Sequence, residues 1–355
     1  MWKYNKGEWS EIYCFAYLLS SGVLYAADKD LNRVEDVYFP IIKIIREETA
    51  GQPIDYHTGE KICIYRGNDL IKEVDKADFE NVVSELLEKI PEGSRAFEIP
   101  TVDDFFESIY CTKVKANSNK KEDITVQLRD IHTGISPICG FSIKSYLGAN
   151  PTLINAGTNT NFEFIIDGCN DSIMDEVNGI DTRTKLIDKM NKLLEYGCSF
   201  RMVEHSISAQ FEENLQYIDS KMPEFLQNMV LFSYMYNVKS TADIMGKMAE
   251  LNPMGFSNPE MYAYKYKKLL AAWALGLTPE RTDWMGAEDA NGGYITIKSD
   301  GDVVCYHLYN RTEFEQYLFD YTVFDRPSTS KFNYFKIYND NGIYKVKLCL
   351  QVRFR

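Results

Sequence analysis

Residues 123–145 have the sequence DITVQLRDIHTGISPICGFSIKS, in which apolar and polar side chains alternate along two separate runs. The apolar members are Ile124, Val126 and Leu128 in the first run and Cys139, Phe141 and Ile143 in the second. A period of two residues is typical of a β-strand with one buried face. Thr133-Gly134, between the runs, favours a turn. We therefore predict an antiparallel β-hairpin over these residues.

The polar faces of the two strands bring together the residue types that carry chemistry. Directly opposed residues in an antiparallel pair share a face. Matching the apolar faces therefore places Asp123, Thr125 and Gln127 on the same side as Ser142 and Lys144.

The position of the turn decides which of these residues meet. A turn centred on Thr133-Gly134 brings Asp123 opposite Lys144, or nearly so. The alternative register, with Asp130 opposite Ser142, would mix the two faces and leave the lysine beside an apolar residue. We therefore prefer Asp123 as the acidic member of the site, and Asp130 is the second candidate.

An aspartate that opens one strand, followed by a turn and an acid-x-Lys sequence, is typical of metal-dependent nucleases. Asp123 would bind a divalent cation, for which Mg²⁺ is the expected cofactor because it prefers hard oxygen ligands. The metal would polarise a phosphate oxygen and generate hydroxide from bound water, and Lys144 would orient that water or stabilise charge on phosphorus. Ser142 stands where the acid is expected, so a second carboxylate must come from elsewhere. The candidates are Glu11, Glu8 and Glu163.

The rest of the chain predicts an α/β first part, a helical middle and a β-rich end. Apolar residues recur at helical spacing in 5–21, and this helix should end at Gly22. Further helices are expected at 76–90, 102–111, 181–196, 209–218, 222–237, 241–251 and 258–275. Strands are expected at 37–47, 61–66 and 161–166, with two more hairpins turning at Asp300-Gly301 and Asn341-Gly342. The expected regions are a catalytic α/β region (1–205), a helical region (206–280) and a basic, DNA-binding, β-rich region (281–355).

Charge is distributed unevenly along the 355 residues. The formal net charge is −13, but residues 326–355 contain seven Lys or Arg and one Asp. A second basic cluster consists of Lys113, Lys115, Lys120, Lys121 and Arg129. The acidic balance argues against a protein that coats nucleic acid, whereas local basic patches fit an enzyme that grips phosphate in one cleft. Solvated charged faces are the simpler alternative.

Cysteine and histidine usage points to reduced thiols and argues against a zinc site. The eight cysteines are scattered without a CxxC pair, and the four histidines form no HExxH motif. The start of the chain lacks the apolar segment of a signal peptide, and no apolar run approaches 18 residues. We expect a cytoplasmic protein.

Several blocks of the sequence, in order, resemble the HpaII family of type II restriction endonucleases. They are NKGEWSE, DITVQLRDIHTG, GFSIKSYLG, PTLINAGTNTNF, GGYITIKSDGDVVCYHLYNRTEFEQYL and KLCLQVRF. The resemblance covers nearly the whole chain. It implies a mixed α/β fold with a PD-(D/E)xK-type nuclease core, Mg²⁺ dependence, and cleavage of double-stranded DNA at CCGG that leaves 5′-phosphates.

The resemblance also assigns roles to particular positions. Asp123 and Lys144 fall where the family's hairpin carries its aspartate and lysine, and Ser142 fills a position that is serine in this family. Glu8 and Glu11 lie in the GEWSE block. This chain departs from the family pattern at Lys331, where Arg is expected, and at Cys349, where Asn is expected. A change at a position that touches DNA would alter the recognised sequence.

Recognition of a G·C-rich site needs side chains that reach guanine O6 and N7. The candidate DNA contacts are Gln127, Asn155, Thr160, Asn161, Arg311, Ser328, Ser330, Lys331, Gln351 and Arg353. Trp284 and Tyr306 are expected in the core. The expected partners are double-stranded DNA, a cognate DNA methyltransferase and a second copy of the chain in a homodimer. The opposing hypothesis is a non-catalytic DNA- or partner-binding protein on a nuclease-like scaffold, and Ser142 is the feature in its favour.

Overall fold

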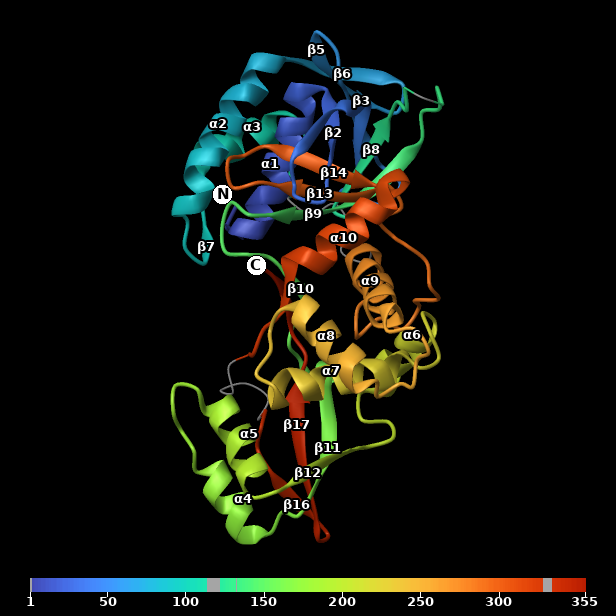
Figure 1. Cartoon of the computed structure of the whole chain (residues 1–355). Coiled ribbons are helices and arrows are strands. Elements are labelled where there is room, and N and C mark those ends of the chain that lie inside the picture. Colours follow the sequence, from blue (N-terminus) through green and yellow to red (C-terminus); the bar gives the residue numbers. More distant parts are fainter. Residues whose placement is uncertain (1, 114–121, 132, 328–333) are drawn as a thin grey trace. The chain divides into compact units, whose positions relative to one another are not determined.

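The computed structural model of the chain describes residues 2–113, 122–131, 133–327 and 334–355 (Figure 1). Within these residues the protein has ten α-helices and several β-sheets, a mixed α/β fold as the sequence predicts. It forms two compact units. The first comprises Met1–Pro151, Ala274–Gly276 and Glu288–Tyr317, and the second comprises Thr152–Trp273, Leu277–Ala287 and Leu318–Arg355. The regional boundaries expected at residues 205 and 280 fall where the type of secondary structure changes. They are not the borders of these two units.

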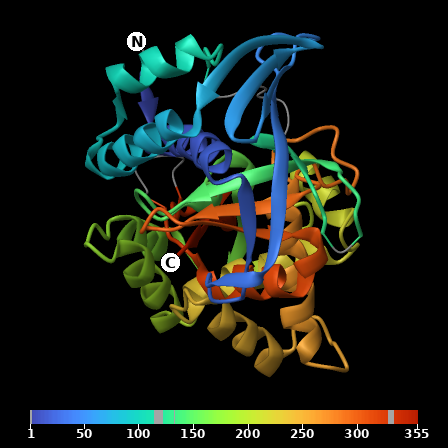
Figure 2. The same ribbon diagram turned by 90° about the horizontal axis from the view of Figure 1, so that it is seen from above.

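The first unit is built on a sheet that has nine strands among the described residues. Its order is β2 (Val23–Ala27), β14 (Val303–His307), β13 (Gly293–Ile297), β9 (Ile138–Ser145), β8 (Ile124–Leu128), β3 (Arg33–Arg46), β4 (Ile54–His57), β5 (Lys61–Arg66) and β6 (Asp69–Asp75). Figure 2 shows the length of β3, the long blue strand that pairs with β2, β8 and β4. A two-stranded sheet of β1 (Tyr4–Asn5) and β7 (Ala96–Phe97) completes the β-structure of this unit.

Helix α1 (Lys6–Ser21) covers one face of this sheet at β9 and contacts α2 (Lys76–Glu92). It ends as predicted at Gly22, whose φ of 70° is the left-handed conformation that glycine adopts easily. Helix α3 (Pro100–Ser108) lies beside α2. The shared core contains fully buried side chains from α1 and from the apolar faces of the strands, including Phe15, Ile44 and Val126. Burial of this apolar face is the main stabilising contribution to the unit.

The predicted hairpin forms, and its two faces are those that the alternation predicted. Val126 pairs with Cys139 on the core side, and Thr125 pairs with Gly140 on the other side. The register, however, differs by two residues from a turn centred on Thr133-Gly134. Extending the observed pairing places Asp123 opposite Ser142 rather than Lys144.

The second unit contains two smaller sheets among its described residues. One has the order β12 (Ser199–Met202), β11 (Asn161–Asp167), β17 (Ile343–Cys349) and β16 (Tyr338–Asp340). The other has the order β10 (Thr152–Ile154), β18 (Val352–Phe354) and β15 (Thr322–Phe324). The helices are α4 (Asp171–Asn178), α5 (Lys185–Glu195), α6 (Ala209–Gln216), α7 (Met222–Met235), α8 (Thr241–Leu251) and most of α9 (Glu260–Leu275). Helix α7 is largely buried and contacts β17 and α5.

Most predicted elements are therefore confirmed, and several short ones were missed. The five predicted helices between 181 and 275 are α5 to α9, and the hairpins at Asp300-Gly301 and Asn341-Gly342 are β13–β14 and β16–β17. Strands β2, β4 and β6 and helices α4 and α10 (Arg311–Tyr321) were not predicted. Trp284 and Tyr306 are buried, as predicted.

All eight cysteines are free thiols, and six of them are buried, in agreement with the predicted absence of disulfides. Among the described residues, no helix is both long and apolar enough to cross a membrane.

Gly293 opens β13 with a φ of 119°, and a Cβ at this position would overlap the backbone carbonyl of Tyr306. We predict that Gly293→Ala lowers the free energy of unfolding by roughly 3 kcal/mol, because it adds a steric clash to backbone strain. Gly342→Ala is the matched control, since Gly342 has a φ of 87° but open space around it. Equal unfolding midpoints for the two variants in chemical denaturation would contradict this prediction.

Candidate active site

Asp123 is held in a fixed orientation by the neighbouring strand β9. Its Oδ2 atom accepts a hydrogen bond from the backbone N–H of Ile143 at 2.8 Å and one from Ser142 Oγ at 3.2 Å. The backbone N–H of Asp123 donates to Phe141 O at 2.8 Å. Charge-assisted hydrogen bonds of this kind are the stronger ones in proteins. Asp123, which the sequence analysis preferred as the acidic residue, is therefore positioned by three contacts with the strand that carries Lys144.

Ser142 acts on Asp123 and is itself buried, with 1% of its surface exposed. The hydroxyl donates to the oxygen that also receives the Ile143 N–H. Ser142 thus occupies the position of the expected acid and positions the carboxylate of Asp123 instead of supplying a second one.

Lys144 follows Ser142 by two residues on β9 and so lies on the same face of the sheet. Strand β13 runs parallel to β9, and it places Tyr294 beside Ser142 and Thr296 beside Lys144. Lys144 is half-buried, and its ammonium group forms no hydrogen bond or ion pair with any residue that the structure describes. The lysine is thus a cation whose charge is not neutralised by a described carboxylate.

Glu11 lies on α1, which packs against β9. Burial raises the pKa of the Cys14 thiol one helical turn away, and the nearby carboxylates of Asp123 and Glu11 raise it further. Both carboxylates therefore act on the same buried thiol, which places Glu11 in the neighbourhood of Asp123. The Oε2 atom of Glu11 is buried, so this carboxylate reaches inward from the helix.

Glu8, the other acid on this helix, is engaged at the helix N-terminus. Its carboxylate accepts the backbone N–H of Asn5 at 2.8 Å, while Asn5 Oδ1 accepts the N–H groups of Gly7 and Glu8. This reciprocal arrangement is a capping box, which stabilises the first turn of a helix. The Glu8 carboxylate is thus engaged in this capping box, and Glu11 is the acid on the helix that acts on Cys14 together with Asp123.

The donor set at this site consists of hard carboxylate oxygens from Asp123 and Glu11. Mg²⁺ is commonly held in proteins by one or two carboxylates together with water and substrate phosphate, so the residues fit this ion. Among the described residues, no group of three or more His, Cys, Asp or Glu side chains is arranged around a common metal position. A site for a metal held entirely by protein ligands is thus not found in that part of the chain.

Asp130, the second candidate in the hairpin, is buried and serves the turn. Its carboxylate accepts hydrogen bonds from Thr133 Oγ1 at 2.7 Å and from the Thr133 N–H at 3.3 Å. The backbone O of Asp130 accepts the N–H of Gly134. The alternative register, with Asp130 opposite Ser142, is therefore wrong, because this residue closes the loop at the far end of the hairpin.

Glu163, the third candidate for the second acid, belongs to the other compact unit. Its carboxylate accepts a hydrogen bond from Tyr338 and lies 3.6 and 3.7 Å from the ammonium groups of Lys345 and Lys347. Positive side chains already compensate this carboxylate, so it is poorly suited to bind a cation.

Glu122 precedes Asp123 and was not selected from the sequence. Its side chain lies over Gly140 of β9 so closely that a Cβ at Gly140 would overlap the carboxylate. Gly140 itself is held by Asn291, whose Oδ1 accepts its N–H at 2.8 Å. The feature of the sequence that could have indicated Glu122 is Gly140, which pairs with Thr125 on the polar side of the hairpin. A glycine there leaves room for a long side chain.

Two candidate DNA contacts lie in the first unit. Gln127 is half-buried on β8, and its Nε2 donates to Ser136 O at 3.1 Å. Arg311 pairs with Glu288 at 2.5 Å and with Glu315 at 2.9 Å, so its charge is compensated within the protein.

The other candidates lie in the second unit or outside the described residues. Thr160 is fully buried and bonds to Gly157, and Asn161 is buried beside it, so neither side chain is at the surface of the unit. Asn155 is exposed, Gln351 is half-buried, and Arg353 pairs with Asp325. Cys349, where the family carries Asn, is buried as well. Ser328, Ser330 and Lys331 lie outside the described residues, as do Lys115, Lys120 and Lys121 of the basic cluster.

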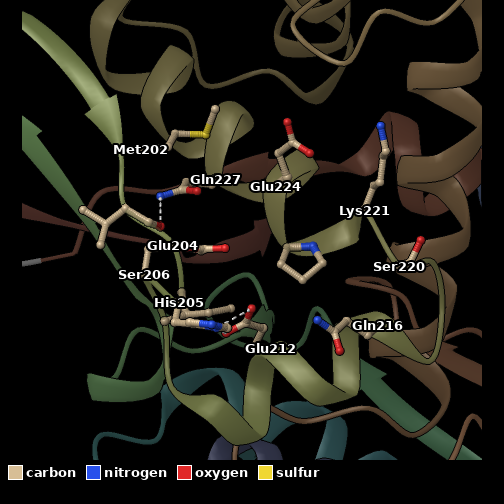
Figure 3. A pocket seen from close by; sticks show the side chains of 13 residues that line it. Met202, Glu204, His205, Ser206, Glu212, Gln216, Ser220, Lys221, Glu224 and Gln227 are labelled. Carbon is tan, nitrogen blue, oxygen red and sulfur yellow. Dashed lines mark hydrogen bonds and ion pairs between the residues drawn. The ribbon is translucent and has the colours of Figure 1, made fainter.

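A hollow of about 420 Å³ lies in the second unit at α6 and α7 (Figure 3). Its wall carries the His205–Glu212 ion pair, and its floor carries Gln227, whose Nε2 donates to the backbone O of Val203. Glu212 raises the pKa of His205 through a hydrogen bond and charge attraction. None of the hairpin residues lines this hollow.

Comparisons with known proteins show the family to which the chain belongs. The chain belongs to the HpaII restriction endonuclease family, whose family model matches residues 5–354. It is therefore a type II restriction endonuclease, a site-specific deoxyribonuclease whose substrate is DNA, and enzymes of this type generally need divalent metal ions.

Among its relatives is the type II restriction enzyme HpaII of Haemophilus parainfluenzae. The two sequences are 38% identical over 360 residues, which cover 99% of this chain and 98% of that protein. No solved structure matches the chain.

We predict that Ser142→Ala slows DNA cleavage roughly tenfold, because one of the two donors to Asp123 Oδ2 is lost while the Ile143 N–H remains. The loss should shrink as the Mg²⁺ concentration rises, since a less well-ordered carboxylate weakens metal binding. Cleavage rates over a range of Mg²⁺ concentrations test this. A variant as inactive as Asp123→Asn at every concentration would contradict it.

We predict that His205→Ala leaves the cleavage rate within about twofold of wild type, because no hairpin residue is among those that line the hollow in Figure 3. Because its folded-state pKa is raised, the His205–Glu212 pair contributes stability that is present below pH ~6.5. This contribution is lost as the pH rises through the raised value. Unfolding midpoints of wild type and variant at pH 5.5 and 8.5 measure it. A collapse of cleavage in the variant would move the active site to this hollow.

Proposed function

We propose that the chain is a Mg²⁺-dependent endonuclease that cuts double-stranded DNA at CCGG and leaves 5′-phosphates, and that its active site is the β8–β9 hairpin on a PD-(D/E)xK-type core. The observation that carries the proposal is the fixed carboxylate of Asp123, which lies opposite Ser142, two residues before Lys144 on β9, with Glu11 nearby. Family membership supports the reaction class, and the 38% identity to HpaII supports the site sequence.

Each residue has a distinct part in the proposed reaction. Asp123 and Glu11 would hold Mg²⁺, which supplies Lewis-acid activation of water and of a phosphate oxygen when bound. The contacts from Ser142 and Ile143 hold Asp123 in one orientation, so that no reorganisation is needed during the reaction. Lys144 donates from its ammonium group to the attacking water or to the phosphate oxygens as negative charge develops. Water would add to phosphorus as the bond from phosphorus to the 3′ oxygen breaks. The upstream fragment then ends in a 3′-hydroxyl, and the phosphate stays on the 5′ oxygen of the downstream fragment.

The proposal has two further parts. A CCGG site is a palindrome, and each strand needs an active site, so the working assembly is a homodimer. A cognate DNA methyltransferase protects the host's own sites.

The test is incubation of plasmid DNA with wild type, Asp123→Asn and Lys144→Ala in Mg²⁺ and in EDTA. We predict discrete Mg²⁺-dependent fragments from wild type, whose ends read CCGG with 5′-phosphates. Each variant should lose at least about 100-fold in rate, because it removes one part of the charge stabilisation.

Lys89→Ala is the matched control for Lys144→Ala, since Lys89 is an exposed helix lysine on α2. Cleavage by Lys144→Ala at the rate of this control would place the active site elsewhere. Failure of wild type to cut with any divalent metal would favour a DNA-binding protein without catalytic activity.

A further inference from the structure

The face of the sheet that carries Asp123 and Ser142 continues across strands β3 and β4. Gln127 of β8 pairs with Lys43 of β3, and Lys43 pairs with His57 of β4. Directly paired residues share a face, and Gln127 is on the same face as Asp123 because they are four residues apart on one strand. The opposite face of the sheet, beside Lys43 and Gln127, carries Ile44 and Val126, which are fully buried in the core. Lys43 and His57 therefore belong to the surface on which the candidate active site opens.

On this surface Lys43 forms an ion pair with Asp55 of β4. About one fifth of each side chain is exposed, so both can be reached from solvent without refolding of the strands. His57 lies 4.0 Å from the same Asp55 oxygen. Burial and the Lys43 ammonium lower the pKa of His57, against the opposing effect of Asp55, so His57 is neutral at neutral pH. Lys43 and Asp55 thus form a pair of one ammonium donor and one carboxylate acceptor, and the pair has no net charge.

A neutral donor–acceptor pair is a poor phosphate site, because binding to the DNA backbone needs an excess of positive charge. It is well suited to the edge of a G·C base pair. In the major groove, guanine presents two acceptors, O6 and N7, and cytosine presents one donor, its N4 amino group. Lys43 can donate to the guanine, and Asp55 can accept from the cytosine.

The distance from the catalytic hairpin fits such a contact. Four residues along β8 and one strand spacing separate Asp123 from Lys43, which is about 14 Å. The major groove of B-DNA is about 12 Å wide. A duplex whose phosphodiester lies at Asp123 therefore brings base edges of the adjoining groove within reach of the pair.

We propose that Lys43 and Asp55 together read one G·C base pair of the DNA substrate from the major groove. The inference rests on the proposed function for the identity of the substrate and adds two residues that determine its specificity. The ion pair of the free protein is exchanged for two hydrogen bonds to the base pair on binding.

The test measures binding rather than cleavage, so that it is decided separately from the proposed reaction. Wild type, with Ca²⁺ in place of Mg²⁺, is used to select its preferred duplex from a randomised pool, and the bound DNA is sequenced. Competition binding then compares the selected duplex with duplexes in which each base pair is replaced in turn. The variants are Lys43→Met and Asp55→Asn, with circular dichroism to establish that each is folded.

Both variants should lose discrimination at the same single G·C position by about 10- to 100-fold, while preferences at the other positions stay unchanged. Lys61→Met and Asp75→Asn are the matched controls, because Lys61 and Asp75 form a cross-strand pair on the same sheet at its outer strands β5 and β6. These controls should keep the wild-type preference at every position.

Other outcomes overturn the inference. A uniform loss of affinity for all duplexes would make Lys43 a backbone contact, and unchanged discrimination would make the pair structural only. Lack of any sequence preference in wild type would refute the inference directly. Sequence-specific binding without cleavage in Mg²⁺ would instead refute the proposed reaction and leave the assignment of Lys43 and Asp55 to be decided by the variants.

Discussion

The hydrogen bond from the backbone of Ile143 to Asp123 is the interaction on which the candidate active site depends. It joins the first residue before β8 to the middle of β9, at 2.8 Å, and Ser142 reinforces it from the same strand. A backbone donor cannot rotate away, so the carboxylate keeps its place as long as the sheet keeps its register. The geometry of the site is thus a property of the sheet, and β8, β9 and β13 must all be in place for it.

The alternation of apolar and polar residues was sufficient to predict the faces of this hairpin but not its register. Val126 and Cys139 both lie on the core side as expected, because burial of an apolar face tolerates no shift by one residue. A shift by two residues keeps every face, so the apolar pattern cannot detect it. The loop decides the register here, since Asp130 bonds to Thr133 and Gly134 and moves the centre of the turn one residue earlier. Asp123 therefore meets Ser142.

The pairing of strands that lie far apart in the sequence could not be predicted from local patterns, for a different reason. Strands β2, β4 and β6 are short or carry many charged residues. The sheet predicted from the sequence therefore had fewer strands than the one observed. The contact between Lys43 and Asp55 depends on which strands become neighbours. Thr160 and Asn161 were chosen because polar residues follow the hairpin closely, but they are buried at the start of β11. The polar side chains of these residues made them candidates for DNA contact. Only tertiary packing could decide which of the candidates lie at the surface.

The parallel pairing of β9 with β13 also bears on the order in which the protein is made. The strand that carries Ser142 and Lys144 receives its second neighbour from residues 293–297, about 150 residues later in the chain. Synthesis at roughly 5–20 residues per second separates the two by roughly 8–30 s. During that interval the growing chain has both Asp123 and Lys144 but lacks the strand that completes their sheet. A DNA-cutting enzyme built in this way completes the sheet of its candidate active site late, when most of the polypeptide has already left the ribosome.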